Sequence, residues 1–338
     1  MNQQTSAGDV VNDGRLRVVS LASTGARSTL AADVRAGLEA APRSLPPKHF
    51  YDARGAELFD AICDTPEYYP TRTEEGLLAA VASRVVARAG ATDLVELGSG
   101  AARKTRLLLE AMLDAGPARY VPVDVAREML VASARTLLAD YPRLTVHGLV
   151  ADYDQPFLEA LPPGESGGRL IAFLGSTIGN FTHDEGAAFL GRIAEQMEGG
   201  DRFLLGLDLV KDPAVLHAAY NDAAGLTAAF NRNVLDVVNR ELEAEFPTEA
   251  FEHVAFYDTE KARIEMHLEA SRAMRVHIGE LDLDVELEAG ERIHTEISRK
   301  FTPEAAERLL SDAGLVLDEW WTDPKGWFAL ALARLPRE

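Results

Sequence analysis

A glycine-containing turn between a short apolar stretch and a helical pattern carries the clearest chemical information in the sequence. Leu94–Leu97 precedes Gly98 and Gly100, and a helical pattern begins at Ala102. Glycine permits a tight turn and lets a ligand approach the backbone closely. Asp124 follows 24 residues after Gly100, at the end of the next predicted strand, where a carboxylate suits two ribose hydroxyls. The pattern therefore predicts a site for a nucleoside-containing cofactor.

Two classes of cofactor use such a turn, and the surrounding residues favour one of them. A dinucleotide site has a third glycine where this sequence has Arg103, so the fingerprint for a pyrophosphate is incomplete. Glu96 stands two residues before the first glycine, and Asp152 follows a third predicted strand, where an acid can bind the amino group of adenine. These residues favour S-adenosyl-L-methionine, because it carries an amino-acid tail rather than a pyrophosphate.

The motifs of metal-dependent and hydrolytic enzymes are missing from the sequence. The eight histidines are scattered without a His-Glu-x-x-His motif, and one cysteine, Cys63, cannot form a disulfide framework or a cysteine-type metal site. No Gly-x-Ser-x-Gly motif is present. We therefore expect no metal, and we expect His267, His277 and His294 to be packed or solvated.

Composition and charge exclude several classes of partner. The 338 residues include 34 Lys and Arg against 54 Asp and Glu, a formal net charge of −20. This charge opposes binding to nucleic acid or to an anionic membrane surface. No apolar run approaches the length of a membrane span, and the N-terminus has no signal-peptide pattern. We expect a cytoplasmic protein whose partners are small molecules, with no nucleic acid and no membrane.

The elements that must position these residues alternate between strand and helix along the middle of the chain. Such alternation predicts a parallel sheet with helices on both faces. The predicted strands are 93–97, 120–124, 144–150, 170–175 and 203–209, and the predicted helices are 102–115, 126–139 and 185–197.

The rest of the chain follows other patterns. Residues 1–13 are polar, and residues 1–28 are expected to form a flexible tail. Thr71 and Glu74 have the spacing of a capping box, which predicts a helix from there to about Arg88. Alternating stretches predict an antiparallel sheet, which interrupts the first pattern. The other predicted helices are 30–41, 56–63, 213–242 and 303–313, and the other predicted strands are 251–257, 263–268, 274–278, 283–287, 293–298, 315–321 and 327–333.

Several longer motifs match a known family. From about Asp33 to the last predicted strand, the chain closely resembles the histidine-specific Nα-methyltransferases. These enzymes make hercynine, the trimethylated betaine of L-histidine, in ergothioneine biosynthesis. The motifs that carry the resemblance are Ser44–Lys48, Phe50–Asp52, Pro66–Arg72, Val95–Gly100, Phe173–Asn180 and Ala228–Asn233.

This resemblance implies a fold, a domain arrangement and a reaction. The fold is the Rossmann-like α/β sheet of class I methyltransferases that depend on S-adenosyl-L-methionine, with a second α+β domain. Residues 73–209 and 301–338 would form the methyltransferase domain, and residues 29–72 and 210–300 the substrate-binding domain. The implied reaction is the transfer of three methyl groups from S-adenosyl-L-methionine to the α-amino group of L-histidine. We expect the enzyme to be a monomer.

The resemblance also assigns roles to single residues. Tyr51 and Asn180 match residues at the reacting amine, and Asn180 with Tyr220 matches a clamp on the substrate carboxylate. Glu296 and Ser298 match the pair that recognises the imidazole. The matches to other substrate-site positions are Gly175, Thr227 and Met266. The matches to contacts with the methyl donor are Tyr68, Gly98, Lys104, Asp124, Asp152 and Tyr153, the last of which is often Phe in the family.

The residue types agree with these implied roles. Glu296 and Ser298 are two residues apart, so on a strand they lie on one face. A carboxylate and a hydroxyl side by side can bond both nitrogens of one imidazole. Taken alone, the same residues also fit a solvated strand face, and Asn180 also fits a helix cap.

Two other functions stay open. The first is a nicotinamide-dependent dehydrogenase, against which Arg103 and Glu96 argue. The second is an inert binding module with a methyltransferase-like fold. The matched tyrosines, Asn180, Glu296 and Ser298 argue against it, because a module without catalysis has no need of them.

Overall fold

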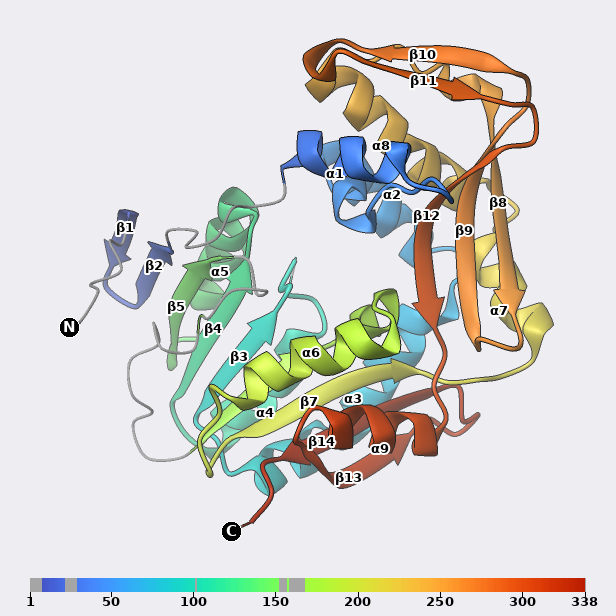
Figure 1. Cartoon of the computed structure of the whole chain (residues 1–338). Coiled ribbons are helices and arrows are strands. Elements are labelled where there is room, and N and C mark those ends of the chain that lie inside the picture. Colours follow the sequence, from blue (N-terminus) through green and yellow to red (C-terminus); the bar gives the residue numbers. More distant parts are fainter. Residues whose placement is uncertain (1–7, 22–28, 101, 152–156, 158–167, 338) are drawn as a thin grey trace.

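A nine-stranded sheet forms the centre of the described residues (Figure 1). This computed structural model describes residues 8–21, 29–100, 102–151, 157 and 168–337. The strand order is β1-β2-β5-β4-β3-β6-β7-β14-β13, and β14 runs antiparallel to both of its neighbours. From β5 to β13 this is the order of a class I methyltransferase, which confirms the predicted Rossmann-like α/β class. The strands are β1 (Gly8–Asp13), β2 (Leu16–Ser20), β3 (Asp93–Leu97), β4 (Ala118–Asp124), β5 (Leu144–Val150), β6 (Arg169–Phe173), β7 (Arg202–Asp208), β13 (Val316–Thr322) and β14 (Phe328–Arg334).

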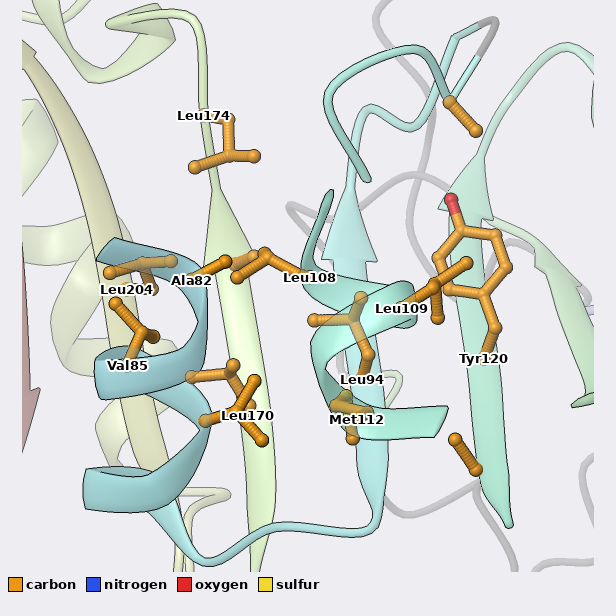
Figure 2. Close-up of a cluster of buried hydrophobic side chains, with 14 of the residues drawn as sticks. Ala82, Val85, Leu94, Leu108, Leu109, Met112, Tyr120, Leu170, Leu174 and Leu204 are labelled. Carbon is orange, nitrogen blue, oxygen red and sulfur yellow. The ribbon is translucent and has the colours of Figure 1, made fainter. Parts of the chain in front are cut away.

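Helices cover both faces of this sheet. Because successive strand residues point to opposite faces, Leu94 packs in one hydrophobic cluster and Val95 in the other. Figure 2 shows the first cluster, in which helix side chains such as Val85 and Leu108 lie over the sheet. The helices of the first cluster are α3 (Tyr69–Ala89), α4 (Thr105–Ala115) and α5 (Arg127–Asp140), and those of the second are α6 (His183–Ala194) and α9 (Pro303–Asp312).

The N-terminal segment corrects one prediction from the sequence. Residues 8–20 form a β-hairpin, and β2 pairs in parallel with β5 at the edge of the sheet. Leu16 and Val18 are buried in the first cluster. Their alternation with exposed residues is the signal of a half-buried strand, so a flexible tail is wrong for these residues.

A second unit, inserted after β7, lies beside the carboxyl ends of the parallel strands (Figure 1). It combines N-terminal helices with two small antiparallel sheets around a third hydrophobic cluster. No helix in the described part of the chain is long and apolar enough to cross a membrane. The elements are α1 (Leu30–Glu39), η1 (Pro47–Phe50), α2 (Ala53–Cys63), α7 (Pro213–Tyr220), α8 (Leu226–Leu242), η4 (Thr248–Ala250), β8 (Phe251–Asp258), β9 (Arg263–Ala270), β10 (Met274–Ile278), η5 (Gly279–Leu281), β11 (Leu283–Leu287) and β12 (Arg292–Arg299).

The start of α3 corrects a second prediction. The helix begins at Tyr69, with Pro70 in its first turn, instead of at a capping box of Thr71 and Glu74. Proline suits this position because the first helical N–H groups have no partner within the helix. Glu74 is therefore free of a capping role, and its side chain is fully buried.

Candidate active site

The glycine turn lies at the carboxyl end of β3, next to the end of β4. Gly98 and Gly100 have φ of +68° and +46°, the left-handed region that favours glycine. A side-chain carbon added to Gly100 would meet no described atom within 4 Å, so the backbone there is open to a ligand. Asp124 accepts hydrogen bonds from the N–H groups of Gly100 (3.1 Å) and Ala126 (2.9 Å). The structure therefore brings the predicted ribose ligand to the predicted turn.

Glu96 lies buried on β3, before this turn. Its carboxylate accepts hydrogen bonds from the hydroxyls of Thr105 (2.6 Å) and Tyr120. Burial raises the pKa of Glu96 to about 7, although both hydrogen bonds act in the opposite direction. These contacts join the strand to the start of α4 and to β4, so they favour a role in holding the turn.

Glu74 is a site residue that its sequence pattern did not reveal. From α3 it accepts hydrogen bonds from the backbone N–H of Gly175 (2.8 and 2.9 Å) and forms an ion pair with Lys104. Lys104 and Gly175 are both predicted site residues, on the loops after β3 and β6. One buried carboxylate therefore holds two of the loops that reach the carboxyl ends of the strands.

A group of aromatic rings lies where α2, α3, α7 and α8 meet. The ring of Tyr51 contacts Phe59 and Phe230 edge-on, at centroid distances of 5.7 and 5.5 Å. Tyr68 contacts Phe59 and Tyr220 in the same way, at 6.1 and 6.5 Å. The structure therefore gathers Tyr51, Tyr68 and Tyr220, which the sequence places far apart.

Glu296 and Ser298 lie on one face of β12, as their spacing predicts. They pair across the strands with Met266 and Ile264 of β9, and both are buried. The hydroxyl of Tyr220 donates a hydrogen bond to Ser298 Oγ at 2.8 Å. Burial raises the pKa of Glu296 to about 7, and the positive charge of Lys300 opposes that rise. A carboxyl group, two hydroxyls and an ammonium group therefore share one buried region.

Lys300 and Asp208 are further residues that the sequence analysis missed. Lys300 Nζ lies 2.8 Å from Asp208 Oδ2, and both side chains are 1% exposed. Asp208, at the carboxyl end of β7, also accepts hydrogen bonds from Tyr69 and Lys211. The spacing 296, 298, 300 could have indicated Lys300, because it continues the same alternation.

Asn180 and Thr227 lie at the ends of two helices near this region. Asn180 ends the short helix η3 (Thr177–Asn180). A side-chain carbon on Gly179 would come within 2.9 Å of the carbonyl oxygen of Arg299, so η3 packs directly against β12. The N–H of Thr227, in the first turn of α8, donates to Asp222 at 2.8 Å. Asp152 and Tyr153 lie outside the described residues.

The opposite face of the same small sheet holds a group of metal-capable side chains. The ligand atoms of Glu265, His267 and His294 lie within 4.8 Å of one another. However, Glu265 already accepts hydrogen bonds from Arg263 and Lys261, and these cations oppose the binding of a metal ion there. Burial lowers the pKa of His267 to about 4, so this imidazole is neutral near pH 7.

Comparison with known proteins decides the family. Residues 30–335 match the model of the family described as histidine-specific methyltransferase, SAM-dependent. The chain belongs to this family. This family depends on S-adenosyl-L-methionine, which rules out the dehydrogenase alternative.

Relatives of known function extend over nearly the whole chain. Histidine N-alpha-methyltransferase of Mycolicibacterium smegmatis is 51% identical over 314 residues, which are 93% of this chain and 97% of that protein. The protein of the same name from Mycobacterium tuberculosis is 49% identical over 305 residues, 90% of this chain and 94% of that one. Ergothioneine biosynthesis protein 1 of Neurospora crassa is 34% identical over 347 residues, 99% of this chain but 38% of that protein.

One solved methyltransferase structure resembles this family member only distantly. The CcbJ methyltransferase from Streptomyces caelestis is 15% identical, with a TM-score of 0.43, over 76% of this chain and 95% of that one. The fold class therefore rests on the strand order of the central sheet.

Proposed function

We propose that this chain transfers three methyl groups from S-adenosyl-L-methionine to the α-amino group of L-histidine. The product would be hercynine, and the reaction would belong to ergothioneine biosynthesis. We further propose that the enzyme acts as a cytoplasmic monomer and needs no metal. Family membership and the relatives named histidine N-alpha-methyltransferase support the substrate and the donor.

The observation that carries the proposal is the pair Glu296 and Ser298 on β12. A carboxylate and a hydroxyl on one strand face can bond the two nitrogens of one imidazole ring. Asn180 lies on η3, which packs against the same strand, so an amide that could bind the amine or carboxylate is near. We assign Gly175, Thr227 and Met266 to the surroundings of the bound substrate.

The enzyme's own residues would act mainly by positioning. S-adenosyl-L-methionine, when bound, supplies a methyl group on a positively charged sulfur. The α-amino group must be neutral to accept it, and with a pKa of about 8 part of it is neutral near pH 7–8. Tyr51 and Asn180 would aim its lone pair at the methyl carbon, and Asn180 would also bind the carboxylate. Tyr220, whose hydroxyl donates to Ser298, would line the substrate site beside it. After each of the first two transfers the amine releases a proton, to water or to a tyrosine hydroxyl.

The donor would lie across the carboxyl ends of β3 and β4. The backbone at Gly100 is open to it, and Asp124 would bind its ribose. Lys104 would bind the methionine carboxylate, and Tyr68 would contact the same end of the donor. Asp152 and Tyr153 would bind the adenine. Glu96 would hold the turn through its hydrogen bonds with Thr105 and Tyr120.

Mass spectrometry of L-histidine incubated with S-adenosyl-L-methionine and the protein tests the proposal. We expect products that carry one, two and then three methyl groups, with the trimethylated product as the end point. Unchanged histidine, together with methylation of a different amine, would overturn the proposed substrate. Unchanged histidine without any methylation would favour the binding module.

A further inference from the structure

The ammonium group of Lys300 uses all of its hydrogen-bond donors inside the protein. It donates to Asp208 Oδ2 (2.8 Å), to Ser298 Oγ (2.8 Å) and to the hydroxyl of Tyr220 (3.2 Å). A lysine has three N–H donors and no acceptor, so these contacts can run in one direction only. Burial lowers the pKa of Lys300, but the charge of Asp208 outweighs burial and leaves it above its ordinary value. Lys300 therefore stays protonated and keeps its three N–H donors near neutral pH.

Lys300 and Tyr220 together set the direction of the hydrogen bonds at Ser298 Oγ. The hydroxyl of Tyr220 accepts from Lys300, and it donates its own hydrogen to Ser298 Oγ. Ser298 Oγ then accepts from both Lys300 and Tyr220, which fills its two lone pairs. The single hydrogen of Ser298 is left for a bound ligand. Ser298 must therefore act as a donor to that ligand and cannot accept from it.

Glu296 supplies a hydrogen-bond acceptor beside the donor Ser298. Burial outweighs the positive charge of Lys300 and raises the pKa of Glu296 to about 7, so its carboxyl group is mainly ionised above that pH. An ionised carboxylate only accepts hydrogen bonds. Above about pH 7 the pair thus offers one acceptor and one donor. A neutral imidazole, with one N–H and one bare nitrogen, matches it, whereas an imidazolium would direct a second N–H at the donor hydroxyl.

We propose that Lys300 is a positioning residue that orients the Ser298 hydroxyl and makes the site selective for a neutral imidazole ring. This inference rests on the proposed function, because it takes the ring to lie against Glu296 and Ser298. Lys300 itself need not touch the substrate.

A double-mutant cycle between Lys300 and Ser298 tests the inference. In the wild-type background, Ser298→Ala should lower kcat/KM for histidine by roughly 10- to 100-fold. In a Lys300→Met background, where Ser298 is no longer held as a donor, the same change should cost less than about threefold. The Kd of S-adenosyl-L-homocysteine should stay the same in all four proteins. A purely structural Lys300 would leave the two losses independent, and the inference would then be wrong.

The chain offers a matched control in Lys211. Lys211 binds the same Asp208 but donates its other hydrogen bonds to Tyr69 and the carbonyl of Leu209. Lys211→Met should lower stability as Lys300→Met does, because each removes one cation from Asp208. Only Lys300→Met should raise KM for histidine by roughly 10-fold or more. Equal values of KM in the two variants would overturn the inference.

Two outcomes separate this inference from the function on which it rests. If Ser298→Ala alone leaves kcat/KM for histidine unchanged, the ring does not lie against Ser298, and the proposed substrate site fails first. If Ser298→Ala is costly but its effect adds to that of Lys300→Met, only the role of Lys300 fails. Should Lys300→Met not fold, Lys300→Gln keeps N–H donors without the charge, and a KM equal to that of wild type would contradict the requirement for the ammonium group.

Discussion

Glu296 is a buried carboxyl group whose proposed role in binding the ring conflicts with the stability of the fold. Burial raises its pKa from 4.5 to about 7. Between these values the folded protein holds a proton that the unfolded chain releases. The contribution of Glu296 to stability is therefore complete below about pH 4.5 and is lost as the pH rises through 7. Because Glu296 lowers the stability of the fold above about pH 7, we expect its function to be ligand binding.

Glu296→Gln should therefore be more stable than the wild type in mildly alkaline solution. Relative to wild type, its free energy of unfolding should rise by roughly 3 kcal/mol between pH 4.5 and 8, because glutamine carries no charge to desolvate. Denaturant titrations at pH 5 and 8 measure the difference, and Glu286→Gln on an exposed part of β11 serves as the control. The variant should also lose activity on histidine. A difference that does not change with pH would show that Glu296 has an ordinary pKa.

Asp124 belongs to the proposed ribose site and also accepts a hydrogen bond from Gly100 in the glycine turn. Asp124→Ala should raise the Kd of S-adenosyl-L-methionine by roughly 10- to 100-fold, as expected for loss of a charge-assisted hydrogen bond. The Kd of Asp124→Asn should lie between those of the wild type and Asp124→Ala, because an amide oxygen can still accept from the N–H of Gly100. Isothermal titration calorimetry distinguishes them. An unchanged Kd in folded Asp124→Ala would remove this residue from the donor site.

At the scale of elements, the hairpin of β1 and β2 covers the edge of the central sheet. An exposed strand edge can pair with other chains, and β2 occupies that edge of β5. The hydrophobic face of β2 also adds Leu16 and Val18 to the first cluster. The hairpin is therefore expected to contribute to stability although it lies before the residues that match the family.

Val18→Ala measures the contribution of this strand. Loss of two buried methyl groups should lower the free energy of unfolding by about 1–3 kcal/mol. Arg17→Ala, at the exposed neighbouring position, should change it by less than about 0.5 kcal/mol. Equal effects of the two substitutions in denaturant titrations would show that β2 is not packed on the sheet.

At the scale of the whole molecule, Asp208 connects the central sheet with the inserted unit. It lies at the end of β7, where the insertion begins, and it binds Lys300, which follows β12 where the insertion ends. Tyr69, at the start of α3, donates to the same carboxylate. Burial raises the pKa of Asp208, but Lys300 and Lys211 outweigh burial and lower it. The charged form of this group therefore supports the junction of the two units.

Asp208→Asn should weaken that junction by leaving buried ammonium groups unpaired. The expected loss is roughly 3–5 kcal/mol in free energy of unfolding at pH 7. In the wild type, burial lowers the pKa of Lys211 to about 8 although Asp208 raises it, so in Asp208→Asn this pKa falls below 8. The loss should therefore shrink as the pH rises toward 8, because Lys211 of the variant gives up its proton first. Asp312→Asn, which removes only a surface pair with His183, is the control. If denaturant titrations at pH 7 and 9 give the same loss in free energy of unfolding, the expected titration of Lys211 is wrong.

The sequence by itself determined the elements and their faces. Strands 144–150, 274–278 and 283–287 were predicted with their exact ends, because hydrophobic periodicity and turn residues are local properties. The shared face of Glu296 and Ser298 also followed from spacing alone. The hairpin at residues 8–20 was missed because its apolar stretch is short and lies in a polar context.

Only the tertiary structure decided which of these residues meet. Tyr220 lies 78 positions from Ser298, Glu74 lies 101 from Gly175, and Tyr69 lies 139 from Asp208. No local pattern encodes such pairs, because they form only when the insertion folds back over the carboxyl ends of the strands. Glu74 resembled a helix cap for the same reason, since its partners come from loops far along the chain. Burial, which turns Glu296, Lys300 and Asp208 into one coupled group, is likewise a property of the packed molecule and not of any one segment.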